Sequence, residues 1–248
     1  MSVNIPIVNK AYLAVSGLQI SWASGTTLTV QAGSARNSTN VNDIVSSASV
    51  TINAAVIGIN GIDAGALANS TLYGIYAVGD STYNSTSGFM LSASLTAPTV
   101  PANYDMIRLI GYVRTSGAAA MLLGYWSGSA NDRMFSYDAP IATAITAGAA
   151  TTDTEVILDT FVPPTQGLEV LINYVMTPAA ASRTLTLKPY GATGVFFQAT
   201  SQVTSIVVRG TALVQAQLNA GKPSLEYLWS AGGGDAVALN VAAYNYSI

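Results

Sequence analysis

The segment Val50-Thr-Ile-Asn-Ala-Ala-Val56 places apolar residues at every second position. The same period of two recurs at Leu28 and Val30, at Leu185 and Leu187, and at Val237, Leu239 and Val241. Such alternation puts one face of a β-strand on a core and the other face outward. Turn-forming pairs such as Asn60-Gly61 and Ser116-Gly117 separate the runs, and short strands at this spacing are typical of a sandwich or barrel. We therefore expect an all-β protein.

The composition changes near residues 139–153, where Ala, Thr and Gly dominate and bulky aromatic residues are absent. This change indicates a linker between two units of ordinary domain size. We expect two antiparallel β domains: residues 1–140, then a linker at 141–153, then residues 154–248 as a small jelly-roll-like sandwich. Two short segments stay open, because Asn42–Ser47 fits a helical turn and Thr211–Asn219 fits helix or strand.

The chain contains no histidine and no cysteine. Histidine is the only side chain whose unperturbed pKa lies near neutrality, and cysteine is a strong nucleophile and a common zinc ligand. A Ser-His-Asp or Cys-His arrangement is therefore excluded, as is a metal site that uses either residue. We expect a protein that is not an enzyme and that needs no cofactor.

Charge is also scarce, because 9 basic and 12 acidic residues are the only charged ones among 248. A monomer of this size exposes roughly 10,000 Å², which leaves about one charge per 500 Å². Half of the residues are hydrophobic, and the mean hydropathy is +0.41. These values favour a surface that is covered partly by Ser, Thr, Asn and Gln side chains and partly by other copies or other proteins, so we expect an assembled protein.

The basic residues are scattered from Lys10 to Lys222 without a cluster, so nucleic-acid binding is not expected. The uncharged runs Ala11–Ala35 and Pro189–Val208 contain Gly, Thr, Ser and Gln, so membrane insertion is not expected either. Residues 1–10 do not have the basic and apolar regions of a signal peptide.

Two acidic groupings leave chemistry open. Asp153, Glu155 and Asp159 fit a calcium site made of oxygen ligands, or solvated residues beside a linker. Glycoside hydrolysis needs only two carboxyl groups across a sugar, and Asp132 with Asp138 is one available pair. Neither grouping has further support in the sequence, so the expectation of a protein without catalytic activity stands.

Three stretches of the first part carry a resemblance: Gly33–Asn40 (GSARNSTN), Asn60–Tyr76 (NGIDAGALANSTLYGIY) and Leu91–Arg114, which includes Pro98-Thr-Val-Pro101 and ends in Arg108-Leu-Ile-Gly-Tyr-Val-Arg114. Together they resemble a module of tailed-bacteriophage virion proteins of the tail-fibre type, over about residues 10–115. Asn37, Leu72 and Asn103 depart from that module's pattern.

The resemblance implies a structural or attachment role and no catalytic residues. We therefore expect a non-enzymatic virion protein, assembled in the host cytoplasm, that forms a homotrimer around a symmetry axis and contacts other virion proteins. A tail or head fibre, a fibre anchor and a capsid decoration protein all fit. The alternative is a receptor-binding protein that recognises host-surface carbohydrate.

Six residues are the candidate contacts. Tyr125, Trp126 and Arg133 combine aromatic rings with a polar group, as sugar-binding sites and protein interfaces do. In the expected strand Ile107–Thr115, alternation places Ile107, Leu109 and Val113 on one face. Arg108, Tyr112 and Arg114 then lie on the opposite face, where contact with a neighbouring chain is possible.

Overall fold

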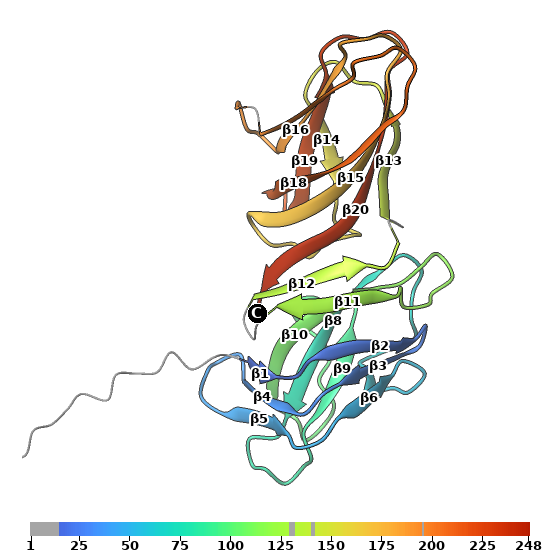
Figure 1. Ribbon diagram of the computed structural model, residues 1–248. Helices are drawn as coiled ribbons and strands as arrows, with labels where there is room; N and C mark the ends of the chain where they lie inside the picture. Colours follow the sequence, from blue (N-terminus) through green and yellow to red (C-terminus); the bar gives the residue numbers. More distant parts are fainter. Residues whose placement is uncertain (1–14, 129–131, 140–141, 195) are drawn as a thin grey trace, which may run out of the picture.

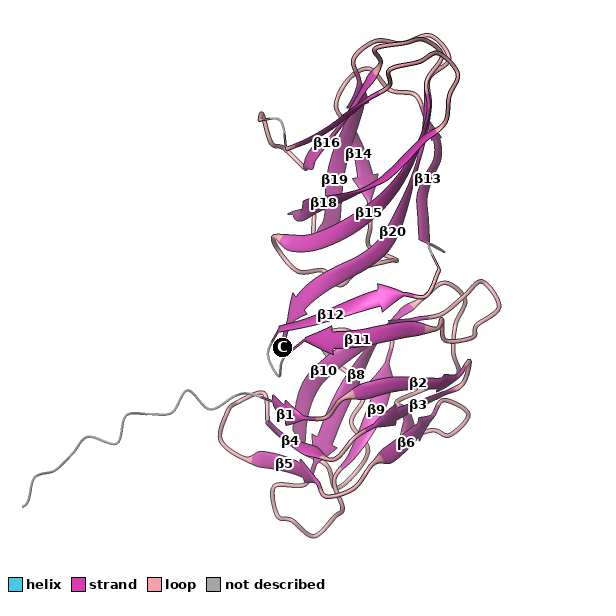
Figure 2. Cartoon of the chain, viewed as in Figure 1, coloured by secondary structure: helices cyan, strands magenta, loops and turns pink. Residues whose placement is uncertain are grey.

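The computed structural model describes residues 15–128, 132–139, 142–194 and 196–248. This part of the chain consists of strands and their connections and contains no helix (Figure 2). The predicted all-β class is confirmed. Two β units lie end to end (Figure 1), and the described residues form no helix able to cross a membrane.

The N-terminal unit contains three small sheets. One joins β1 (Val15–Gly17), β4 (Gly33–Arg36) and β5 (Asp43–Ser46), and a second joins β2 (Ile20–Ser24), β3 (Thr27–Val30) and β6 (Val50–Asn53). The third has the order β10 (Met106–Arg114), β8 (Leu72–Gly79), β9 (Gly88–Ser92) and β7 (Gly61–Ile62). Pairing is antiparallel except between β7 and β9, which are parallel.

The alternating residues of the N-terminal unit point as the sequence predicts. Leu28, Val30 and Ile52 are fully buried in one core, while Thr29 and Thr51 on the same strands lie toward the surface. Full burial of such an aliphatic side chain contributes about 1.5–3 kcal/mol relative to exposure. The period of two is therefore what selects the strand conformation here.

The C-terminal unit is one ten-stranded sheet that curls on itself. Its first half has the order β11 (Gly124–Gly128), β12 (Asp132–Tyr137), β20 (Ala236–Ser247), β15 (Leu168–Thr177) and β18 (Val208–Asn219), with β13 (Ala142–Gly148) also paired to β20. Its second half contains β14 (Thr154–Ile157), β19 (Lys222–Trp229), β16 (Thr184–Pro189) and β17 (Phe197–Thr200). The two halves enclose a single hydrophobic core, consistent with a sandwich.

A splayed hairpin connects the two halves. β18 and β19 pair only at Gln217–Ser224, Leu218–Pro223 and Asn219–Lys222, next to their shared turn. Beyond these pairs the two strands separate: β18 pairs with β15, and β19 pairs with β16. The segment Thr211–Asn219, which the sequence left open between helix and strand, is therefore strand, because Ala212, Val214 and Ala216 alternate into the core.

Two predicted segments have a different structure. Within Asn42–Ser47, residues Asp43–Ser46 form β5 rather than a helical turn, because Ile44 is buried opposite Ala35 of β4. Within the predicted linker 141–153, residues Ala142–Gly148 form β13 along one edge of β20, with two register shifts. The small uncharged residues of this segment are thus part of a sheet.

Strand β10 belongs to both units because of a bulge between Leu109 and Gly111. After the bulge the two faces of the strand exchange sides. Val113 lies in the N-terminal core, whereas Leu109 packs against the C-terminal core that contains Tyr112. The prediction that Leu109 and Val113 share one face is therefore wrong, since the extra residue, Ile110, breaks the period of two.

Candidate functional site at the junction of the two units

Arg133 of β12 is the central polar residue of the junction. Its side chain points from the C-terminal sheet into the N-terminal unit, where Nη1 donates to the carbonyl oxygens of Leu18 (3.1 Å) and Ile110 (3.0 Å). Nη2 donates to the carbonyl oxygen of Gly17 at 3.1 Å. Arg133 is only 3% exposed and forms no ion pair within the described residues. One guanidinium thus joins three backbone carbonyls of the other unit.

Trp126 of β11 makes a second link. Its indole Nε1 donates to the carbonyl oxygen of Tyr112 at 3.1 Å, and its ring packs on Phe135 with the centroids 5.0 Å apart. Phe135 in turn contacts Tyr137 and Tyr244, and Tyr112 contacts Tyr246 edge-on at 5.2 Å. The result is a continuous aromatic cluster across the junction. Aromatic pairs of this kind contribute about 0.5–1.5 kcal/mol each beyond the area they bury.

Arg114, at the end of β10, makes the third link. Its Nε donates to the carbonyl oxygen of Thr160 at 2.6 Å, and its guanidinium carbon lies 4.7 Å above the centre of the Phe161 ring. The Tyr137 hydroxyl donates to the Phe161 carbonyl oxygen at 2.7 Å. The connection between β14 and β15 is therefore held from both units. Tyr112 and Arg114, which the sequence offers as contacts to a neighbouring chain, are buried against their own chain.

The remaining predicted residues, Tyr125 and Arg108, make none of these three links. Tyr125 is 56% exposed, and its hydroxyl donates to Oδ1 of Asp138 at 2.8 Å. Arg108 is partly exposed and reaches the side-chain oxygen of Asn40 at 3.4 Å. The structure thus brings Trp126, Arg133, Tyr112 and Arg114 together at the junction and leaves Tyr125 and Arg108 open to solvent.

Burial also controls the ionisation of the cluster. It raises the pKa of Tyr112 to about 12 and raises the pKa of Tyr137, Tyr244 and Tyr246 as well. The Arg133 guanidinium partly offsets this effect at Tyr246, because a nearby positive charge favours the phenolate. Burial lowers the pKa of Arg133, since the charged form loses hydration. All four phenols are therefore neutral packing groups at neutral pH, and the Tyr137 hydroxyl is also a hydrogen-bond donor.

No protein-family model matches this chain. No curated protein matches it either.

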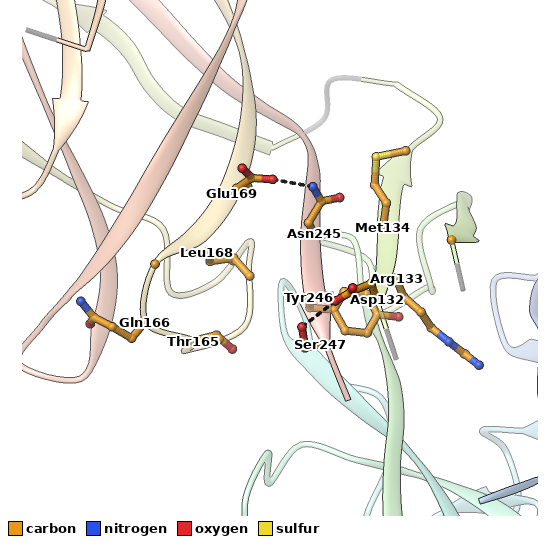
Figure 3. A pocket seen from close by; sticks show the side chains of 12 residues that line it. Asp132, Arg133, Met134, Thr165, Gln166, Leu168, Glu169, Asn245, Tyr246 and Ser247 are labelled. Atoms are coloured by element: carbon orange, nitrogen blue, oxygen red, sulfur yellow. Dashed lines mark hydrogen bonds between the residues drawn. The ribbon is translucent and has the colours of Figure 1, made fainter. Parts of the chain in front are cut away.

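A polar hollow of about 500 Å³ lies beside the junction (Figure 3). On one side Asn245 donates to Glu169 at 2.9 Å and Ser247 donates to Asp132 at 2.8 Å. Thr165 lies across the hollow from them, whereas the Gln166 amide and the Arg133 guanidinium both point away from it (Figure 3). Each carboxylate already accepts a hydrogen bond from β20, so the hollow offers mainly further acceptor positions.

The acidic groupings do not form the sites that the sequence left open. Asp132 begins β12 and Asp138 follows its end, so at about 3.3 Å per residue they lie about 20 Å apart, too far for a glycosidase pair. Asp153 pairs with Lys188 at 2.6 Å and Asp159 with Lys222 at 3.0 Å. Glu155 accepts from Asn219 and Ser224. Within the described residues no cluster of three or more acidic side chains is placed to hold a metal ion.

Sequence reasoning did not find a second hollow, of about 400 Å³, beside the connection between β16 and β17. Tyr190 and Phe196 line it together with Gln166, Gln215 and Gln217. The available signal was Phe196 beside the glycine-rich turn Gly191–Gly194, because an aromatic residue on a turn is exposed unless something covers it. The glutamines gave no signal, since they come from separate segments that only the fold brings together.

Proposed function

We propose that this chain is a non-enzymatic structural component of a tailed-bacteriophage virion, acting by assembly with its own copies, as a homotrimer, and with other virion proteins. The resemblance of residues 10–115, of which 15–115 are described, supports the virion assignment. The observation that carries the structural role is the junction. Its tryptophan, tyrosine and arginine side chains, which are also the types found in binding sites, hold one β unit on the other.

The junction supports a structural role because a virion component must hold its parts at fixed positions. A flexible linker between the units would allow them to rotate. Here Arg133 binds three carbonyl oxygens of the N-terminal unit, and Arg114 binds the β14–β15 connection. Leu72, Tyr112 and Leu122 of the N-terminal part also belong to the hydrophobic core of the C-terminal unit. Hydrogen bonds and shared core together oppose relative motion.

The surface supports assembly. The accessible surface is 11653 Å², so 21 charges give about one per 550 Å². Large apolar side chains are exposed on both units, among them Val41, Ile57, Phe196, Ile206 and Leu213. Single exposed apolar residues are ordinary, but with so few charges between them they favour contact with other protein.

Two measurements test this proposal. Light scattering of the purified chain at micromolar concentration should give three times the 25.5 kDa chain mass. Mass spectrometry of gradient-purified particles of the phage that encodes the chain should find its peptides in a fixed ratio to the major capsid protein. A monomer in solution contradicts the homotrimer, and absence from the particles contradicts the virion assignment.

Recognition of host-surface carbohydrate is the second candidate function. Tyr125, exposed on the edge strand β11, is the observation in its favour. Its predicted partner Trp126 is committed to the junction through its indole N–H and its ring contact. Loss of glycan-array binding in Tyr125→Ala, with Trp126→Phe still binding, supports this candidate at the predicted place. Unchanged binding in Tyr125→Ala excludes that place.

A further inference from the structure

The hollow beside the β16–β17 connection has two aromatic walls. Phe196 is 60% exposed, and Tyr190 lies on the same connection, which projects from the side of the C-terminal unit (Figure 1). Pro189 adds a third flat apolar group. An aromatic face that remains in contact with water is available to stack on the C–H groups of a ligand.

Three glutamine amides form the polar part of the same hollow. Gln166 comes from the β14–β15 connection, and Gln215 and Gln217 come from β18. Gln166 accepts a hydrogen bond from the Leu218 backbone N–H at 3.0 Å and donates through Nε2 to Oε1 of Gln217. This chain of hydrogen bonds fixes two amide planes before any ligand arrives, which lowers the entropy cost of binding.

The glutamine amides keep hydrogen-bond donors and acceptors that a ligand can use. The Gln217 NH₂ group keeps its donors, because among the described residues only its carbonyl oxygen is used. Gln215 is exposed, and its amide offers both donors and acceptor. Of the described residues that line the hollow, none is charged. Ligand sites commonly combine apolar walls with a few placed polar groups in this way.

We propose that this hollow binds a neutral oligosaccharide. A sugar ring presents one apolar face of C–H groups and a rim of hydroxyls that both donate and accept. Aromatic rings match the apolar face, and amides match neighbouring hydroxyls. A charged ligand would find no opposite charge in this hollow, and a purely apolar ligand would leave the three amides without partners.

A third hollow lies near Phe196 and is lined by Gly194. Gly194 is close to the Phe196 ring, since a β-carbon added at this glycine would lie 3.7 Å from it. Gly194 lines this hollow of about 460 Å³ together with Thr184, Thr186 and Gln198. Lys188, which also lines it, pairs with Asp153 at 2.6 Å and with Glu226 at 3.3 Å, so these three groups together carry one net negative charge. Hydroxyl and amide groups thus extend along the outer face of β16 and β17. The arrangement fits more than one sugar residue, with Phe196 near both hollows.

Saturation-transfer NMR on the full chain tests the proposal, with maltotetraose, cellotetraose, chitotetraose and mannotetraose as probes and a heparin tetrasaccharide as the charged comparison. We expect at least one neutral probe to bind. Phe196→Ala and Gln215→Ala should each weaken that binding by about tenfold, as loss of one aromatic or bidentate amide contact does. Tyr83→Ala, which removes a similarly exposed ring from the N-terminal unit, is the control and should bind normally.

Three outcomes overturn the proposal: no neutral probe binds, only the heparin fragment binds, or Phe196→Ala binds as well as the parent chain. The test does not depend on the virion assignment, since it uses the isolated protein. A chain absent from virions can still bind sugar, and a virion protein can fail to bind it, so the two proposals fail separately.

Discussion

Replacing Arg133 with methionine tests the junction directly. Methionine keeps most of the apolar stem and removes the guanidinium, so Gly17, Leu18 and Ile110 each lose the hydrogen bond that their carbonyl oxygen accepts. Three bonds to a charged donor at about 1.5–3 kcal/mol each give a gross loss of about 4.5–9 kcal/mol. The substitution also removes the desolvation penalty of a buried charge that has no ion-pair partner, which offsets part of this loss. We therefore expect the free energy of unfolding to fall by about 3–5 kcal/mol.

Urea denaturation followed by circular dichroism measures this loss. At a slope near the upper end for single domains, the midpoint should fall by about 1–2 M. Calorimetry should also separate one transition into two, because the units lose their strongest polar connection. Lys222→Met is the matched control, since it removes a half-exposed pair with Asp159 that contributes at most about 1 kcal/mol. An Arg133→Met protein within about 1 kcal/mol of the parent, unfolding in one transition, refutes the reasoning about the junction.

Three further predictions follow from the same region. Gly124→Ala places a β-carbon 2.3 Å from the Phe135 ring, so denaturant titrations should show a loss of about 1–3 kcal/mol in the free energy of unfolding. Gly117→Ala is the control, because open space surrounds that position and its stability should not change. Equal effects of the two substitutions contradict the packing at Gly124. Trp126→Phe keeps a ring but loses the bond to the Tyr112 carbonyl, and thermal melts should show a loss of about 1 kcal/mol; an unchanged melt argues against that bond. In alkali, the pKa of Tyr112, raised from 10.0 to about 12 by burial, means that the folded protein binds more protons than the unfolded chain above pH 10. Stability is therefore full below pH 10 and falls as pH rises toward 12, and tyrosinate absorbance should appear together with unfolding; full ionisation near pH 10 with the fold intact contradicts the burial.

Most strands could be predicted from local alternation, because a period of two can be recognised from neighbouring residues alone. Leu28, Val30 and Ile52 face the core as expected. The pairing of the strands was not predictable in the same way. Asp132 of β12 pairs with Ser247 of β20, far along the chain, and nothing local in either segment specifies the other. The bulge before Gly111 was equally hidden, since one extra residue inverts the faces without changing the composition.

The candidate residues show what a pattern can specify. Tyr, Trp and Arg near one another indicate a surface that will be covered; Arg133 is indeed buried, and Trp126 is partly buried. The pattern does not say which surface does the covering, and here it is the N-terminal unit of the same chain. The sugar-binding hollow was beyond prediction for another reason: Gln166, Phe196 and Gln217 converge from three segments, and no spacing in the sequence relates them.

The position of β20 has a consequence for how the chain is made. This strand pairs with β12, β13 and β15, and it follows all three in the order of synthesis. While the ribosome is still producing earlier residues, these three partners have an open edge and the core lacks Val237, Leu239 and Val241. Long-range pairing of this kind is slow and leaves apolar surface open to wrong partners. Incomplete chains therefore lack a closed sandwich and should be cleared by cellular proteases before they meet finished copies.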